Sequence, residues 1–258
     1  NYRLRHQVYC RELGFEPVSP DDLERDEFDA RSVHCLVQSV ASGLDVGCAR
    51  LVLLDPDEPA GQLPLELACA ETIDRSLVSA MAGERSRIAE ISRLAVIGSY
   101  RRRQGEQNTP ISISEADFGT SERPRQPYLA LAVYLSLIAL ARQYRVSVLL
   151  LLSERKLATN LARLGVRLQQ IGQPVDHRGM RVPSLLLVEQ VIDGMSGPLH
   201  ALFELISREL CQGIEAAGTS AVRANHRPLE SASGILRMPP TCLADIAADG
   251  SAHAPLDA

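Results

Sequence analysis

YLALAVYLSLIALARQYRVSVLLLL, residues 128–152, holds two apolar runs of different kinds. The first run, Tyr128 to Ala141, has 14 residues and is broken only by Ser136. It is apolar on every side, yet shorter than the roughly 20 residues that cross a bilayer, so we predict a helix buried in a protein core. The second run, Val146 to Leu152, is flanked by polar residues and is typical of a central strand covered on both faces.

Weaker patterns on both sides extend this pair into an α/β fold. Towards the N-terminus we expect a helix over 2–13, a loop over 15–32, a hairpin of strands 34–40 and 46–54, a helix after Asp74 and a strand over 87–97. Towards the C-terminus we expect a helix over 154–164 capped by Ser153, strands over 166–171 and 182–189, and an amphipathic helix over 198–213. This order of elements predicts one mixed central sheet flanked by helices.

Two stretches without periodicity set the expected domain boundaries. Residues 104–127 are polar, and a structureless loop of this length is uncommon in a compact domain, so we expect a flexible insertion. Residues 214–258 are rich in Ala, Ser, Gly, Pro and Asp, so we expect a disordered tail. Between these limits we expect a main domain over 1–195, followed by a C-terminal amphipathic helix over 196–213.

The composition argues against several classes of protein. A net charge of −5 disfavours a nucleic-acid partner, since proteins that bind nucleic acid usually carry a basic face. The cysteines lack CxxC spacing and the histidines lack HExxH spacing, so we expect no metal site and mostly buried free thiols in a reducing cytoplasm. The sequence contains no GxSxG, GxxxxGK[ST] or GxGxxG motif. We find no secretory signal and no run long enough for an integral membrane segment, so we expect a cytoplasmic protein.

An acidic triplet is the first candidate for chemistry. Glu24, Asp26 and Asp29 follow one another in the predicted loop, beside Phe28. Such a cluster is either a solvated acidic loop or an anionic wall that holds a cationic substrate or pairs with arginines.

Glu90-Ile91-Ser92-Arg93-Leu94-Ala95-Val96 is the second candidate. In a regular strand Glu90 and Arg93 point to opposite faces, so the two share a face only if a bulge lies between them. The pair is either an ion pair at the end of a strand or a site in which Glu90 handles a proton and Arg93 plays a structural pairing role.

The run Arg101-Arg102-Arg103-Gln104-Gly105 is the third candidate. Guanidinium groups chelate phosphate oxygens and glycine lets backbone N–H groups approach, so the run suits a phosphate cradle, although basic runs commonly mark a solvated face. Arg5 in the first helix and Arg50 in the second strand, taken singly, are each typical of a surface position.

Taken in order, these segments resemble the autoinducer (acyl-homoserine-lactone) synthases, which belong to the GNAT superfamily of acyltransferases. The N-terminal motifs that carry the resemblance are Leu4-Arg5-x-x-Val8-Tyr9, Leu13-Gly14-Phe15, Glu24-x-Asp26-x-x-Asp29, Gly47-x-x-Arg50-Leu51 and Glu90-x-Ser92-Arg93-Leu94-x-Val96. The C-terminal half looks more like the PEP-CTERM/exosortase system-associated acyltransferases, which are related to N-acyl amino acid synthases. The motifs there are Arg163-Leu164-Gly165, Ile171-Gly172-x-Pro174-Val175-Asp176 and Gly179-x-Arg181-x-Pro183.

The resemblance implies a GNAT fold whose central sheet splays between two middle strands and receives an acyl thioester there. It implies catalytic roles for Glu90, Ser92 and Arg93 and a phosphate-binding role for Arg101, Arg102, Arg103 and Gly105. It also implies that the amine-substrate side of the site is lined by the residues at the matching motif positions and their aromatic neighbours: Arg5, Phe15, Glu24, Asp26, Phe28, Asp29 and Arg50. No permanently bound cofactor is implied, because coenzyme A or an acyl-carrier protein brings the acyl group.

This chemistry agrees with the residues present. Acyl transfer from a thioester to an amine needs a deprotonated amine, close reactants and a stabilised oxyanion, but no covalent intermediate on the protein. We therefore expect Glu90 to accept the proton, backbone N–H groups near Leu94 to Val96 to stabilise the oxyanion, and the apolar runs on either side of residue 145 to enclose the acyl chain.

Three functions follow from these expectations. The first is an N-acyltransferase, an enzyme that moves a fatty acyl group from an acyl-carrier protein or coenzyme A to the amine of a small amino-acid-like acceptor. The second is a homoserine-lactone synthase that uses S-adenosylmethionine. The third is a non-catalytic module that binds acyl carriers.

Overall fold

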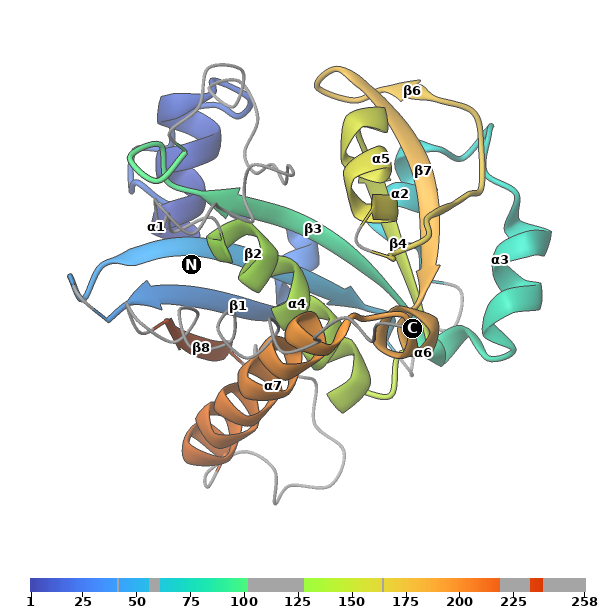
Figure 1. The fold of residues 1–258 in the computed structure, drawn as a ribbon. Helices are drawn as coiled ribbons and strands as arrows, with labels where there is room; N and C mark the ends of the chain where they lie inside the picture. The colour runs from blue at the N-terminus through green and yellow to red at the C-terminus, as the bar shows by residue number, and fades with distance from the viewer. Residues whose placement is uncertain (41, 56–60, 102–127, 164, 219–232, 239–258) are drawn as a thin grey trace, which may run out of the picture.

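The computed structural model describes residues 1–40, 42–55, 61–101, 128–163, 165–218 and 233–238. Its centre is a mixed sheet in the order β5-β7-β4-β3-β2-β1-β8, with β6 paired to β7 (Figure 1). Neighbouring strands are antiparallel except for β3 with β4 and β1 with β8. The strands are β1 Ser32–Ser39, β2 Asp45–Leu53, β3 Ile88–Val96, β4 Val148–Ser153, β5 Gln169–Gln170, β6 Val175–Asp176, β7 Met180–Leu187 and β8 Ser233–Met238.

Helices cover both faces of this sheet. The α-helices are α1 Tyr2–Arg5, α2 Pro64–Ala68, α3 Arg75–Ala82, α4 Tyr128–Gln143, α5 Arg155–Arg163, α6 Val188–Asp193 and α7 Gly197–Gly218. Three further helical segments have other periods: the π-helix η1 His6–Glu12, which continues α1, and the 3₁₀ helices η2 Glu27–Arg31 and η3 Arg85–Arg87. The predicted mixed α/β sheet with flanking helices is confirmed.

The larger core is built around α4 and α7 on one face of the sheet (Figure 1), and it also includes Leu4, Val8 and Tyr9 of α1 and η1. Every residue of α4 from 131 to 141 is buried, as the all-round apolar run predicts. The helix approaches β2 so closely that a Cβ atom on Gly47 would lie 3.1 Å from Cγ2 of Val133. The next strand, β4, is buried as well, because its alternate side chains face this core and a second core on the opposite face.

The second core holds α2 and α3 against the other face of the sheet. In β3, Ile88 contributes to it, whereas Ala89 and Ile91 point into the larger core. Since side chains alternate along a strand, Glu90 points to the same face as Ile88, towards α2. The helix after Asp74 was predicted, and the Asp74 carboxylate accepts the backbone N–H of Leu77 at the start of α3. The short helix α2 has no counterpart in the predicted elements.

The two middle strands part from one another. β3 and β4 pair through Ile88, Ala89 and Glu90 on β3, which lie opposite Val148, Leu149 and Leu150. Beyond Glu90, β3 stays paired with β2 to Val96, while β4 follows β7, so the two strands diverge (Figure 1). This is the splay that the resemblance implies, and Glu90 lies at the point where it opens.

A β-bulge lies within β3, just beyond this point. Cys48 lies opposite Ala95 and Arg50 opposite Ser92, so one residue of β2 faces two residues of β3, Arg93 and Leu94. Arg93 has a φ of 51°, in the left-handed region that non-glycine residues seldom adopt. The bulge that Glu90 and Arg93 need in order to share a face is therefore present.

The C-terminal half differs from the predicted elements in several places. Ser153 does not cap α5, because it is the last residue of β4 and its hydroxyl has no hydrogen-bond partner within the described residues. The short helix α6 was not predicted. Part of the expected disordered tail is ordered, since α7 runs to Gly218 and Ser233–Met238 pair in parallel with β1. The expected insertion over 104–127 lies outside the described residues.

None of the helices in the described part of the chain is long and apolar enough to span a membrane.

Candidate active site

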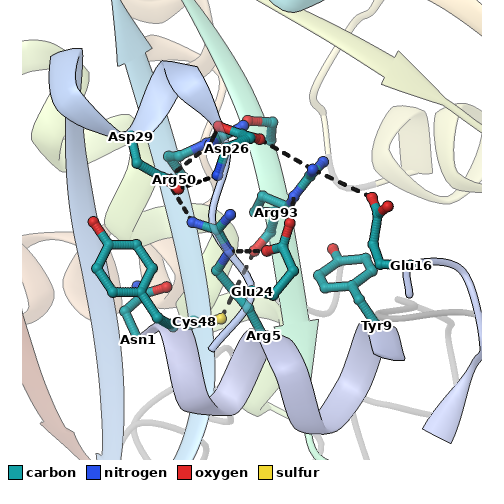
Figure 2. Close-up of polar contacts among 12 residues, drawn as sticks. Asn1, Arg5, Tyr9, Glu16, Glu24, Asp26, Asp29, Cys48, Arg50 and Arg93 are labelled. Carbon is teal, nitrogen blue, oxygen red and sulfur yellow. Dashed lines mark hydrogen bonds and ion pairs between the residues drawn. The ribbon is translucent and has the colours of Figure 1, made fainter. Parts of the chain in front are cut away.

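A network of buried ion pairs lies where α1, η2, β2 and β3 meet (Figure 2). At its centre is Arg5 of α1, whose side chain is fully buried. Its Nε donates to Glu24, and its Nη1 lies 2.5 Å from Oδ1 of Asp29. A single arginine in an amphipathic helix is usually exposed, so its own position in the sequence does not indicate this burial.

Arg50 joins β2 to the same carboxylates. Its Nη1 lies 2.8 Å from Oδ1 of Asp29 and also donates to Asp26, and its Nε donates to the Ser92 hydroxyl over 3.0 Å. Ser92 is therefore placed as an acceptor within the network rather than beside a base that would activate it as a nucleophile.

Arg93 completes the network from the bulge. Its Nε lies 3.1 Å from Glu24, and its Nη2 lies 3.0 Å from Asp26 and 3.3 Å from Glu16 (Figure 2). Because the bulge adds one residue, Arg93 reaches carboxylates that Arg5 and Arg50 also bind.

The acidic triplet is held by the local fold of the chain as well as by the arginines. Oδ1 of Asp26 accepts the backbone N–H of Phe28 over 3.0 Å, and Oδ2 of Asp29 accepts the backbone N–H of Asp26 over 2.8 Å, so the two carboxylates cap η2 reciprocally. An Asp three residues from an N-capping Asp is the sequence signal for this box. All three carboxylates pair with arginines, as one of the predicted alternatives states, whereas a substrate-binding role stays a prediction.

Charge pairing sets the ionisation of these carboxyls. Burial alone would raise the pKa of Asp29, but the hydrogen bond and charge of Arg5, together with the charge of Arg50, lower it to about 2. The pKa of Asp26 is also lowered, by Arg50 and Arg93, against the effect of burial. Asp26 and Asp29 are therefore ionised near neutral pH, so these two carboxylates hold negative charge against the arginines rather than a transferable proton.

Glu90 behaves differently. It is 4% exposed, and burial raises its pKa to about 8, although the backbone N–H of Leu65 and the charges of Arg50 and Arg93 act in the opposite sense. Oε2 of Glu90 accepts the Leu65 N–H over 2.6 Å. A carboxyl group with such a pKa can take and release a proton near neutral pH.

The backbone of β3 beyond Glu90 offers hydrogen-bonding groups to the gap between the strands. Ile97 donates its N–H to the carbonyl of Val46 in β2. Because the backbone groups of successive residues in a strand point alternately to its two sides, those of Val96 and Leu94 face away from β2. The Tyr9 hydroxyl donates to the Leu94 carbonyl over 2.7 Å, which agrees with this orientation. The Leu94 and Val96 N–H groups thus point towards the side that β4 has left.

Phe15 and Phe28, both predicted to contact the substrate, are not brought together. Each is partly buried, but Phe15 packs against the larger core and Phe28 against the second core. The Phe28 ring is covered by the Arg31 guanidinium, 5.3 Å from the ring centroid. Their substrate-binding roles stay predictions.

Of the predicted phosphate cradle, the structure describes Arg101. Its guanidinium pairs with Glu12 of η1, and Oε1 of Glu12 also accepts the backbone N–H of Gly98 over 3.2 Å. Arg102, Arg103 and Gly105 lie outside the described residues. The position after β3 can therefore hold an oxyanion, here the carboxylate of Glu12.

Three residues of this region were missed by sequence reasoning as site residues. Tyr9 and Glu16 lie in or next to quoted motifs, but nothing in their spacing marks them. Arg178 lies in the turn between β6 and β7, and its Nη2 pairs with Glu16. No periodic pattern links residues so far apart, because only the tertiary fold brings that turn to η1.

No group of His, Cys, Asp and Glu in the described ranges is arranged to hold a metal ion. Cys10, Cys35, Cys48 and Cys69 are buried free thiols, as predicted, whereas Cys211 is exposed.

Comparison with known proteins gives a family match over part of the chain. Residues 4–109 match the family described as an acetyltransferase (GNAT) domain. This match and the mixed sheet with its parted middle strands confirm the predicted fold class. No curated protein matches the sequence.

Solved structures give distant likenesses. TofI, solved in a ternary complex with an inhibitor and MTA, is 20% identical, with a TM-score of 0.49 over 78% of this chain and 89% of that chain. MesI, a CoA-dependent acyl-homoserine lactone synthase, is 19% identical, with a TM-score of 0.48 over 80% and 85%. FeeM, an N-acyl amino acid synthase from uncultured soil microbes, is 15% identical, with a TM-score of 0.39 over 59% and 66%. At this distance no activity is transferred to the present chain.

Proposed function

We propose that this protein is an N-acyltransferase that moves a fatty acyl group from a thioester to the amine of a small amino-acid-like acceptor. The observation that carries the proposal is the parting of β3 and β4 just beyond Glu90, next to a β-bulge in β3. The match of residues 4–109 to an acetyltransferase domain supports the same class of reaction.

Glu90 is the proposed base. The attacking amine must lose a proton, and a carboxyl with a pKa of about 8 accepts one, directly or through water, far better than an ordinary glutamate at the pH where amines begin to deprotonate. The amine nitrogen then bonds to the thioester carbonyl carbon, the C–S bond breaks, and the thiolate leaves and takes up a proton.

The backbone N–H groups of Leu94 and Val96 are the proposed oxyanion donors. A tetrahedral intermediate places negative charge on the former carbonyl oxygen, and preorganised N–H donors stabilise that charge. The buried ion pairs around Arg93 fix the bulge that aims these donors, so Arg5, Arg50, Glu24, Asp26 and Asp29 act as supports and form the wall of the acceptor side.

The donor is proposed to be an acyl-carrier protein or coenzyme A. Arg101 and the arginines that follow it supply charge for a phosphate group, and the apolar faces of α4 and β4 supply a wall for the acyl chain.

The test is an assay of the full chain with acyl-coenzyme A and acyl-carrier protein donors and a panel of amines, reading thiol release and the amide product by mass spectrometry. Donor-dependent thiol release matched by amide formation is expected. Neither product with any donor and amine would rule the proposal out and favour the non-catalytic carrier-binding module. Lactone formed from S-adenosylmethionine would favour the homoserine-lactone synthase instead.

An association with the PEP-CTERM/exosortase system and a cytoplasmic location remain predictions from the resemblance and the composition.

A further inference from the structure

Two guanidinium groups from different parts of the fold converge on one carboxylate oxygen. Glu16 follows η1, Arg93 lies in the bulge of β3, and Arg178 lies in the turn between β6 and β7. Nη2 of Arg93 lies 3.3 Å from Oε1 of Glu16, and Nη2 of Arg178 pairs with the same oxygen (Figure 2 shows the Arg93 contact).

This group lies at the rim of the charged network. The side chains of Arg93, Glu16 and Arg178 are 15%, 20% and 27% exposed, whereas Arg5 at the centre of the network is fully buried. The Glu16 position is therefore accessible to a small solute, whereas the ion pairs of Arg5 are not.

Three guanidinium groups, those of Arg93, Arg178 and Arg181, gather around Glu16 at this rim. Arg181 also reaches this region and lies 2.8 Å from Glu154. Next to Arg178, burial and the charges of Arg178, Arg93 and Arg181 together lower the pKa of His177, and Glu16 opposes them only in part.

The rim is next to the proposed reacting centre. Arg93 directly precedes Leu94, whose N–H is a proposed oxyanion donor and whose carbonyl binds Tyr9. The Arg93 guanidinium also lies over the Tyr9 ring, 5.7 Å from its centroid. A carboxylate held by Arg93 and Arg178 would therefore lie beside the strand that carries the proposed oxyanion donors.

The β6–β7 turn presents Arg178 in an unusual backbone conformation. Arg178 has a φ of 55° and is followed by Gly179 with a φ of 96°. The turn is closed by the His177 N–H, which donates to the Gly179 carbonyl over 3.0 Å. Non-glycine residues seldom adopt this region, and those that do gather at ligand-binding sites.

We propose that Arg178, together with Arg93, binds the carboxylate of the acceptor amino acid, and that Glu16 is the resident carboxylate that the acceptor displaces. This inference rests on the proposed function and makes it more specific, since the acceptor must carry a carboxylate beside its amine. Arg178 is then a specificity determinant.

The competing explanation is that Arg178 and Glu16 merely tie the β6–β7 turn to η1. The two explanations differ in acceptor selectivity, because a structural tie affects every acceptor equally. We therefore compare glycine, leucine and phenylalanine with their carboxamides, using the full chain and its Arg178→Gln variant.

The ratio of kcat/KM for each acid over its amide is expected to fall about tenfold in Arg178→Gln, equivalent to about 1.4 kcal/mol, with little change for the amide. Arg178→Lys should retain part of the ratio. Glu16→Gln should lower KM for the acids and not for the amides. Arg142→Gln, which breaks the exposed α4–α7 pair with Glu204, is the matched control and should keep the ratio. An equal loss for acid and amide, or no change in the ratio, overturns the inference.

A binding measurement separates this inference from the proposed function. Calorimetry with N-dodecanoyl-glycine and its carboxamide needs no turnover. If no amine is acylated but the chain prefers the carboxylate and Arg178→Gln removes that preference, the carboxylate site stands and the transferase proposal fails. Equal affinity for the two compounds overturns the site, whatever the activity.

Discussion

Glu90 occupies the last paired position of β3 before the sheet opens, and its carboxyl is the one in this region that burial leaves without a guanidinium partner in the described residues. The neighbouring Asp29 shows the contrast, because Arg5 and Arg50 hold its pKa at about 2. The type of residue therefore does not decide which carboxyl group can exchange a proton. The presence or absence of a guanidinium partner decides this, and the spacing of residues in the sequence does not reveal that partner.

Glu90→Gln should lower kcat roughly 10²-fold or more while the affinity for the acyl donor is retained, since the amide keeps the shape of the side chain but cannot accept a proton. In the unmodified chain kcat should rise with pH through about 8, the pKa of Glu90, because the ionised form is the active base. The variant should lack this rise. Rate profiles and donor binding by calorimetry measure both, and unchanged turnover would remove Glu90 from the mechanism.

The same substitution should change the pH dependence of stability. The folded pKa of about 8 lies above the unfolded value of roughly 4.3, so the folded state binds more protons between these limits. The free energy of unfolding due to Glu90 is therefore greatest below the unfolded pKa and falls as pH rises through the folded pKa. Urea unfolding across this range should show the unmodified chain losing stability relative to Glu90→Gln. A constant difference between the two would mean that burial does not perturb this carboxyl.

Arg5 and Arg11 provide a matched pair in one helical segment. Arg5→Gln leaves Glu24 and Asp29 buried without their main partner, which should cost about 3–5 kcal/mol of unfolding free energy. Arg11 pairs with Asp22 at the surface and is 58% exposed, so Arg11→Gln should cost about 0–1 kcal/mol. Denaturant unfolding measures both. Similar losses would show that the buried network contributes no more than a surface pair.

At the scale of the element, the sequence predicts best where one pattern decides the structure. The apolar run of α4 and the run of β4 were both found, because burial on all sides leaves a composition that no loop has. The sequence indicates that Glu90 and Arg93 share a face only if a bulge lies between them, but it does not predict the bulge. The bulge depends on how β3 pairs with β2. The false cap at Ser153 arose because β4 continues one residue further through its pairing with Val182 of β7. The short helices α2 and α6 carry too few residues for a period to appear.

Arg145 at the end of α4 allows a clean test of backbone strain. Val146 donates its N–H to Ala141 and Arg145 donates its N–H to Arg142, which is the Schellman pattern, and Arg145 has a φ of 58°. Arg145→Gly should raise the free energy of unfolding by roughly 1 kcal/mol, because glycine adopts this φ without steric cost. Arg145→Ala keeps a Cβ atom and should give no gain. Thermal unfolding of both variants measures the change in stability. Equal changes in the two variants would mean that the loss of the arginine side chain, rather than relief of backbone strain, is responsible.

At the scale of the whole molecule, the described segments after residue 213 belong to the fold rather than to a tail. Composition indicates disorder after residue 213, but α7 packs against α4, and β8 pairs with β1 from His34 to Ser39. A short strand of this kind is stabilised by the edge of β1, which is about 200 residues away in the chain, so no local pattern predicts it. The edge of β1 would otherwise expose its backbone N–H and C=O groups.

Truncation after Gly218 should therefore uncover the β1 edge. We expect concentration-dependent self-association and a lower denaturation midpoint, because an unpaired strand edge invites pairing with another chain. Truncation after Met238 keeps β8 and is the matched control. It should show the same association state and the same denaturation midpoint as the full chain. Light scattering and urea unfolding measure both effects. Acyl transfer by the monomeric fraction should survive, since the proposed site lies between β3 and β4, on the far side of β2 from this edge. Identical behaviour of the two truncations would mean that β8 does not protect β1.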